Sequence, residues 1–256
     1  MNFESFFDDK HIVSVLARMR VKAASSRRKQ NFLGNISPTS RRKAELPEII
    51  SLFPPRNQWL RPPAHRRTTR NSESVTVEAI LGAVYRSRFF GGVATSPWAI
   101  RLRDYCENIR TRALVASDFE LSAPTVVPVP KDREGNLYRP IAMIKDIREA
   151  VIVSQTAKYL RQCFDPDFLP NSYAFRCSSP KKTAPSHHDA IHDLATFRKA
   201  HKAPLWVAEC DIKGFFDVVN HDVAWKAFLD ACSRAGDRGQ FVEPRAISLL
   251  RSSLYS

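Results

Sequence analysis

Apolar positions recur at helical spacing along most of the chain. Near the N-terminus this spacing predicts an amphipathic helix over 3–21. Its apolar face consists of Ile12, Val15, Leu16 and Met19. Between 74 and 114 the spacing predicts two helices separated by the Gly91-Gly92 pair. The second helix carries Trp98, Leu102 and Tyr105, and we expect these side chains to pack in a core rather than to stack on bases.

Residues 125–145 read as a β-hairpin. The first strand, 125–130, contains prolines that suit the edge of a sheet. A polar turn at 131–136 contains Gly135 and Asn136, which adopt unusual backbone angles readily. The return strand is 137–144. On these residues alone, an ordinary solvated hairpin is favoured over a site at which Lys131, Arg133 and Arg139 bind a triphosphate.

A helix is predicted to follow the hairpin and to end at Phe164. Asp146 is placed to cap it, with Glu149 three residues later as in a capping box. The face expected to pack on a core is formed by Ala150, Val153, Ala157, Leu160 and Phe164.

The last third of the chain combines a strand with two helices. The first helix includes Ile191 and Leu194. The apolar run Leu205–Cys210 is long enough for a buried strand. Asn220 can cap a helix that starts at His221. Its inner face would consist of Ala224, Phe228 and Ala231.

Composition narrows the class of protein. The chain has 256 residues, of which 43% are hydrophobic, so it can bury a sizeable core in one or two domains. It lacks a run of eighteen apolar residues, and its acidic start does not resemble a signal peptide. Five scattered cysteines without a C-x-x-C pair fit reduced thiols. We therefore expect a cytoplasmic protein that does not enter a membrane.

Charge points to a polyanionic partner. The net charge is +14, and residues 20–70 hold thirteen Lys or Arg against two acids. Prolines interrupt this region, which predicts a loosely ordered arm with one short helix near 45–52. We expect the arm to contact RNA phosphates through Arg27, Arg28, Lys29, Arg41, Arg42, Lys43, Arg66 and Arg67.

Two acids flank a tight turn after the apolar run. Asp211 follows the run directly, Gly214 permits a sharp change of direction, and Asp217 comes after two aromatics. A carboxylate at a strand end can hold a divalent cation against the phosphates of a ligand. The wording D-I-K-G-F-F-D-x-x-x-H at 211–221 resembles the first palm motif of reverse transcriptases, in the form found in bacterial group II introns and retrons.

Two upstream segments resemble the same family. Pro130-Lys131, Gly135 and Arg139-Pro140-Ile141 are similar to the fingers hairpin, which implies that Lys131 and Arg139 hold the phosphates of the incoming nucleotide. Ser172-Tyr-Ala-Phe-Arg176 resembles the S-x-G-F-R signature, with alanine in place of glycine. The resemblance makes Ser172 and Arg176 candidates for template contact. Alternation along a strand is the other explanation of this segment.

The resemblance implies an α+β, right-hand polymerase fold. It divides the chain into a basic extension (1–73), a helical segment (74–124) and a reverse transcriptase domain of fingers and the first part of a palm (125–256). The implied activity is RNA-directed DNA synthesis with an RNA template, a DNA primer and deoxynucleoside triphosphates. Asp211 and the main-chain carbonyl of Ile212 would ligate two Mg²⁺ ions. Phe215 and Phe216 would contact the nucleotide, and Phe216 would reject a ribose 2′-OH.

A second palm motif, Y-x-D-D, is missing from the 256 residues. One carboxylate cannot hold two cations about 3.5–4 Å apart. We therefore expect this chain alone to be inactive, with the rest of the palm supplied by a downstream region or chain. The alternative is a non-catalytic, maturase-like RNA-binding protein derived from such an enzyme. His188 and His192 have zinc-ligand spacing, but H-E-x-x-H and nearby cysteines are lacking, which disfavours a zinc site. The resemblance implies instead that this helix packs behind the palm.

Overall fold

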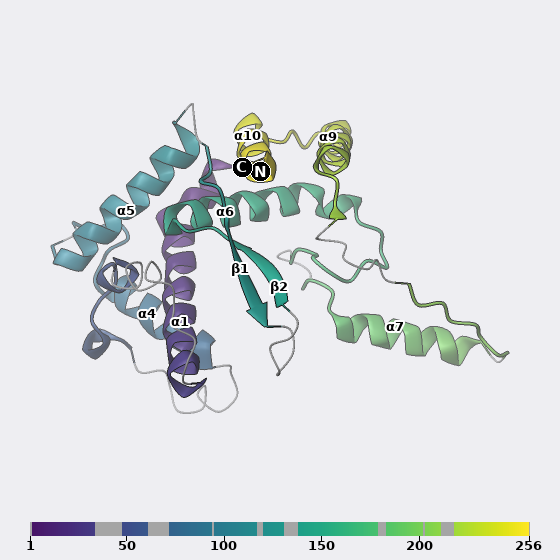
Figure 1. Ribbon diagram of the computed structural model, residues 1–256, viewed down its shortest axis with the longest axis horizontal. Helices are drawn as coiled ribbons and strands as arrows, with labels where there is room; N and C mark the ends of the chain where they lie inside the picture. Colours follow the sequence, from purple (N-terminus) through teal and green to yellow (C-terminus); the bar gives the residue numbers. More distant parts are fainter. Residues whose placement is uncertain are drawn as a thin grey trace. The chain divides into compact units, whose positions relative to one another are not determined.

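The computed structural model describes residues 2–33, 48–60, 72–93, 95–116, 120–130, 138–178, 183–201, 203–210 and 218–255. The side chains of 24–33, Ser72, Pro130 and Arg139 are not included in that description. The described residues are mostly helical, with one two-stranded sheet, so the class is α+β in this coarse sense. The chain divides into two compact units, residues 2–155 and residues 156–256, and the boundary falls inside helix α6 (Figure 1).

Of the described long helices, the first unit contains α1, α4, α5 and the first half of α6, together with the hairpin. Its elements are a 3-10 helix (Glu4–Phe7), α1 (Asp9–Leu33), a 3-10 helix (Arg56–Gln58), α4 (Ser72–Arg86), α5 (Pro97–Leu114), β1 (Thr125–Pro130), β2 (Tyr138–Met143) and the first turns of α6 (Ile147–Phe164). A short helical stretch at 48–51 confirms the helix predicted near 45–52. The unit contains the predicted basic extension, helical segment and hairpin together.

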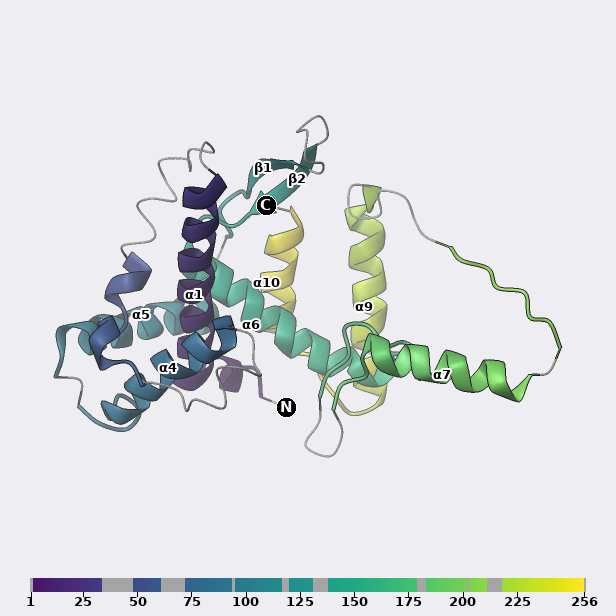
Figure 2. The ribbon, with the colours of Figure 1, turned by 90° about the horizontal axis from the view of Figure 1, so that it is seen from below.

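The core of the first unit forms where α1 packs on α4 and α5 (Figure 2). Each helix contributes an apolar face. The fully buried side chains of this core include Ile12 and Leu16 of α1, Ile80 and Val84 of α4, and Leu102 and Ile109 of α5. Trp98 and Tyr105 are also buried, which confirms that these aromatics belong to a core. The break between α4 and α5 lies at Gly91-Gly92 as predicted, and Gly91 has a φ of +88°.

Helix α1 is longer than its apolar stripe. It continues to Leu33 through Arg27, Arg28 and Lys29, where a loosely ordered arm was predicted, so that prediction is wrong for residues 22–33. The physical reason is local. Alanine, lysine, arginine and glutamine are strong helix formers, and neither proline nor glycine occurs before position 34.

The packing face of α6 differs from the prediction. Of the expected residues only Leu160 is buried, and Ala157 is exposed. The buried face is instead formed by Val151, Ile152, Gln155, Thr156, Tyr159, Leu160 and Cys163. The prediction failed because the buried face of α6 includes polar residues, which interrupt the helical spacing of apolar positions. Gln155, for example, is fully buried because its Nε2 donates to the Phe6 carbonyl at 2.5 Å.

The hairpin forms as predicted, with β1 antiparallel to β2. Pro128 lies directly opposite Pro140, and neither residue has an N–H to donate. This pair must therefore be a non-hydrogen-bonded one, and the hydrogen-bonded pairs lie on either side of it. By the same alternation Pro130 also falls on a non-hydrogen-bonded position, so the prolines remove no bond from the ladder.

The second unit is built on the last turns of α6. It adds a 3-10 helix (Asp165–Asp167), α7 (His187–Ala200), α9 (His221–Asp237) and α10 (Pro244–Tyr255). The predicted cap is confirmed, since Asn220 Oδ1 accepts from the backbone N–H groups of Asp222 and Val223 at 2.9 and 3.1 Å. Phe228 on the predicted inner face of α9 meets Phe164 edge-on at 5.6 Å. Helix α10 was not predicted from the sequence.

Two predictions fail in the second unit. Helix α7 forms, but Ile191, Leu194 and Phe197 are all more than half exposed, so the described part of the chain does not bury its apolar face. Residues 204–210 form neither a helix nor a strand, and Trp206 is fully exposed. A run such as Leu205–Cys210 is buried only when neighbouring strands cover it, and the described part of the chain supplies none.

Among the described residues, no helix is both long enough and apolar enough to cross a membrane.

Candidate functional site

Most residues predicted to bind metal, nucleotide or RNA lie outside the described part of the chain. These are Lys131, Asp211, Ile212, Phe215, Phe216, Arg41, Arg42, Lys43, Arg66 and Arg67. For Arg27, Arg28, Lys29 and Arg139 only the backbone is described, in α1 and in β2. Arg139 pairs with Val129 in the hairpin ladder, directly before Pro140. Ser172 and Arg176 are described in full.

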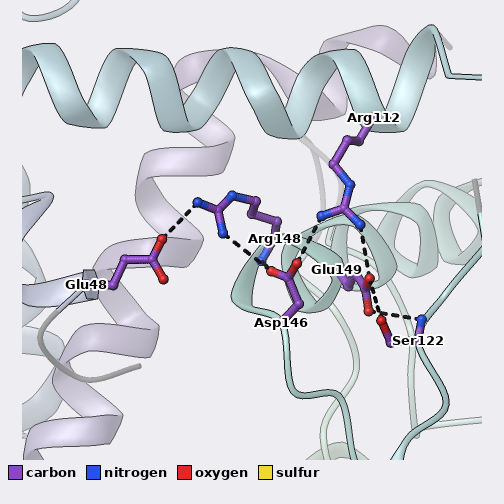
Figure 3. Close-up of polar contacts among 6 residues, drawn as sticks. All are labelled: Glu48, Arg112, Ser122, Asp146, Arg148 and Glu149. Carbon is purple, nitrogen blue, oxygen red and sulfur yellow. Dashed lines mark hydrogen bonds and ion pairs between the residues drawn. The ribbon is translucent and has the colours of Figure 1, made fainter. Parts of the chain in front are cut away.

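A polar cluster lies at the base of the hairpin, and we refer to it as the foot cluster (Figure 3). It consists of Glu48, Arg112, Ser122, Asp146, Arg148 and Glu149. Arg112, in the last turn of α5, donates from Nη1 to Asp146 Oδ2 and from Nη2 to Glu149 Oε1, both at 3.0 Å. The Glu149 side chain is only 3% exposed, so this charge is kept inside the protein by its ion pair.

Glu149 also binds the segment that precedes β1. Ser122 donates its hydroxyl to Glu149 Oε1 at 3.0 Å and its backbone N–H to Oε2 at 3.2 Å. The predicted capping box is therefore half correct. Asp146 caps α6 by accepting from the Arg148 N–H at 2.7 Å, but the Glu149 carboxylate points to Arg112 and Ser122 instead of back to the cap. A buried cation competes better for this carboxylate than a backbone N–H does.

The outer half of the foot cluster is centred on Arg148. Its Nη2 donates to Glu48 at 2.8 Å, and its Nη1 lies 3.8 Å from Asp146. The guanidinium also lies over the ring of Tyr105, 4.1 Å from the centroid. The Glu48 side chain is 41% exposed, so this pair contributes less to stability than the inner one. Arg148 nevertheless joins the short helix at 48–51 to the start of α6.

The chemistry of the foot cluster is structural. Its three carboxylates all accept from arginine side chains, and these pairs join residues that are separated by 34 to 100 positions. The arrangement fixes four segments relative to one another: the helix at 48–51, the end of α5, the run before β1 and the start of α6.

A second polar site follows α6. Arg176 donates from Nε to Asp165 Oδ1 at 3.1 Å and from Nη1 to the carbonyls of Ser172 and Leu169 at 3.2 and 3.3 Å. Its side chain is 17% exposed. Partial burial raises the pKa of Asp165, but hydrogen bonds from Arg176 and from the Cys177 N–H outweigh burial and hold that pKa below its usual range. In this structure Arg176 organises the 165–177 loop, and template contact stays a prediction.

The same loop presents an aromatic side chain. Phe175 is 78% exposed and has a φ of +59°, the left-handed region that residues other than glycine rarely adopt. The family signature has glycine one position earlier, at the place of Ala174. The loop contains no strand, so the alternation of Tyr173 and Phe175 along a strand is not observed.

Metal ligands do not gather in the described part of the chain: no three His, Cys, Asp or Glu side chains come together there. The magnesium ligands expected at Asp211 and Ile212 lie outside those residues. His187 and His188 of α7 lie against one another, with ring centroids 3.9 Å apart.

Sequence reasoning missed the central residues of the foot cluster. Arg112 and Ser122 were not singled out, and Glu149 was assigned to a cap. A weak signal existed, because the cluster places a basic residue in the last turn of α5 and an acid in the first turn of α6, where helix dipoles favour them. No local pattern says that these two ends meet.

Comparison with known proteins adds no relative. No protein-family model matches this sequence, and neither the curated proteins nor the solved structures contain a significant match to it.

Proposed function

We propose that this chain supplies the fingers and the first palm motif of an RNA-directed DNA polymerase, of the type found in bacterial group II introns and retrons. The observation that carries the proposal is a succession of features in family order. A proline-containing hairpin at 125–143 is followed by the Ser172–Arg176 signature, and D-I-K-G-F-F-D then precedes a capped helix at His221. A right-hand polymerase fold follows from the proposal.

The proposed roles follow from the chemistry of each residue. Arg139 and Lys131, on the hairpin, bind the phosphates of the incoming deoxynucleotide, the arginine through its two-pronged guanidinium. Asp211 and the Ile212 carbonyl would hold Mg²⁺, and the bound metal would supply activation of the primer 3′-OH and neutralisation of the leaving pyrophosphate. Phe216 would exclude a ribose 2′-OH. Arg176 holds the loop before the palm in shape.

RNA binding is the part of the proposal that the 256-residue chain tests directly. Residues 20–70 carry thirteen basic residues against two acids, so they supply most of the phosphate contacts. Deleting 34–47 and 61–71, which hold seven of these residues and leave α1 intact, is expected to weaken RNA binding strongly. The slope of log affinity against log salt concentration is also expected to become shallower, by roughly 0.7–0.9 for each lost phosphate contact. Unchanged affinity and slope would refute the role of the arm.

Polymerisation is tested in an enzyme completed with a palm region that carries Y-x-D-D. There Asp211→Asn is expected to abolish cDNA synthesis, because it removes charge from a ligand shared by both metal ions. RNA affinity is expected to stay within twofold of the wild type, because Asp211 is not part of the arm. Asp217→Asn is the matched control and is expected to retain most activity. Near-normal synthesis by Asp211→Asn contradicts the proposal.

A second function has a specific observation in its favour. The run 204–210 forms no strand, and the apolar side chains of α7 are exposed. These exposed apolar residues favour, as the second candidate, a maturase-like RNA-binding protein that needs no metal. The two functions separate in one experiment: RNA binding that persists in EDTA, without primer extension after the palm region is supplied, favours the binding protein.

A further inference from the structure

Both ends of the hairpin are tied to one guanidinium. Strand β1 begins three residues after Ser122, and β2 ends three residues before Asp146. Arg112 bonds Asp146 directly and reaches Ser122 through Glu149, with every contact between 3.0 and 3.2 Å. Figure 3 shows Arg112 above both carboxylates, with Ser122 below Glu149. The entry and the exit of the hairpin are therefore held by the same pair of side chains.

The described part of the hairpin makes few contacts with helices. Neither β1 nor β2 packs extensively on a described helix, although Thr125, Val127 and Met143 are partly buried. Val126 and Tyr138 are 62% and 59% exposed, so their apolar surface contributes little anchoring. A two-stranded ribbon is only marginally stable in water by itself. The direction in which this ribbon leaves the core must come largely from its base.

The ladder of the hairpin is also short. With Pro128 opposite Pro140 at a non-hydrogen-bonded position, the hydrogen-bonded pairs are Thr125–Met143, Val127–Ile141 and Val129–Arg139. The pair nearest the foot cluster, Thr125–Met143, closes the ribbon. Fraying from the base would open this pair first, and the foot cluster is what opposes it.

We propose that Arg112 and Glu149 are positioning residues that set the orientation of the hairpin, and that they thereby control how well Lys131 and Arg139 grip a nucleoside triphosphate. The functional consequence rests on the proposed polymerase function, whereas the mechanical role does not. The fork of the guanidinium is essential to it, because two carboxylates on two segments must be bound at once. A lysine ammonium supplies the charge without the fork.

Amide hydrogen exchange in the 256-residue chain tests the mechanical role. The reporters are the amides of the three hydrogen-bonded pairs, compared with amides in the buried turns of α1 and α5. In Arg112→Gln we expect hairpin exchange to accelerate tenfold or more, while exchange in α1 and α5 stays within twofold of the wild type. Arg112→Lys is expected to restore the thermal midpoint but not the hairpin protection. If the role of Arg112 were only electrostatic, Arg112→Lys would restore both the thermal midpoint and the hairpin protection.

Two further variants keep the test decisive. Glu48→Gln removes an ion pair of the same cluster that touches neither end of the hairpin, and it is expected to leave hairpin exchange unchanged. Ser122→Ala removes only the hydroxyl bond to Glu149, and it is expected to accelerate exchange at Thr125 and Met143 first. If Arg112→Gln fails to fold, Ser122→Ala decides. Hairpin exchange like that of the wild type in Ser122→Ala and in any folded Arg112→Gln, or acceleration spread evenly over α1 and α5, overturns the proposal.

A nucleotide arm separates this inference from the proposed function. Deoxyadenosine triphosphate with magnesium chloride is expected to slow exchange in peptides covering 125–143 of the wild type. The concentration needed is expected to rise at least fivefold in Arg112→Gln. If the nucleotide leaves the wild-type hairpin unprotected, the polymerase proposal loses its nucleotide site while the exchange results still decide the role of Arg112. If it protects both proteins equally, Arg112 does not position the grip.

Discussion

The two glutamates of the foot cluster form ion pairs of similar length but different burial, so they show how burial changes the contribution of an ion pair to stability. Glu149 accepts from Arg112 at 3.0 Å and Glu48 accepts from Arg148 at 2.8 Å, so their geometry is similar. Their side chains differ in exposure, 3% against 41%. Replacing each by glutamine is the same chemical change, and we expect the free energy of unfolding to fall far more at position 149.

The magnitude follows from the donors around Glu149. Oε1 accepts from Arg112 Nη2 and from the Ser122 hydroxyl, while Oε2 accepts from the Ser122 N–H. Glutamine has one oxygen, so in either orientation its amide nitrogen faces a donor, and the side chain at this position is only 3% exposed. Losing a hydrogen bond to a charged group costs about 1.5–3 kcal/mol. Because the new amide nitrogen would also face another donor, Glu149→Gln should lower the free energy of unfolding by about 2–4 kcal/mol. Glu48→Gln should cost about 0–1 kcal/mol, as exposed pairs do.

Urea unfolding followed by tryptophan fluorescence measures this difference. Because the chain has two units, a single transition cannot be assumed. Replacing Trp206 and Trp225 with phenylalanine leaves Trp59 and Trp98 to report on the first unit. The free energy is extrapolated linearly to water with the slope compared between variants. Equal losses at the two positions, or a loss below about 1 kcal/mol for Glu149→Gln, would show that burial does not govern the energetics of the foot cluster.

Three further predictions rest on other parts of the chain. In the completed enzyme, Phe216→Val is expected to raise ribonucleotide incorporation at least tenfold in single-nucleotide extension assays; if discrimination is unchanged, Phe216 is not the gate and Phe215 is tested next. Cys210 is exposed, whereas Cys106 and Cys163 are buried, and burial raises the pKa of both buried thiols. Alkylation followed by mass spectrometry should therefore label Cys210 before these two. Early labelling of Cys106 would contradict the packing of α5. The pKa of Asp165 is held below its usual value of 3.8, so its stabilising contribution is present above about pH 4 and is lost as the pH falls through the folded-state pKa. The amides of 165–177 should therefore lose protection from exchange over that acid range, and Asp165→Asn should remove this pH dependence. A loop that opens equally in both proteins would refute the role of this carboxylate.

The sequence by itself determined the local structure. Helical spacing located α1, α4 and α5 and their buried faces, because a regular apolar stripe can be buried only in one way. Turn residues and prolines located the hairpin, and the side chain of Asn220 located the start of α9. Each of these features depends on residues within a few positions of one another. The continuation of α1 to Leu33 was equally local. The prediction of an arm was wrong there because the prolines that support it begin only at Pro38, after the end of this helix.

Only the tertiary structure decided where polar residues go. Gln155 is buried because the Phe6 carbonyl accepts a hydrogen bond from its side chain. Glu149 does not take part in the cap of α6 because it binds Arg112, which lies 37 positions earlier in α5. The fate of Leu205–Cys210 is likewise non-local, since an apolar run becomes a buried strand only beside partner strands. Spacing records what a segment can bury, whereas burial itself depends on which distant segments lie against it. For that reason the faces of α1, α4 and α5 could be read in advance, and the foot cluster at the base of the hairpin could not.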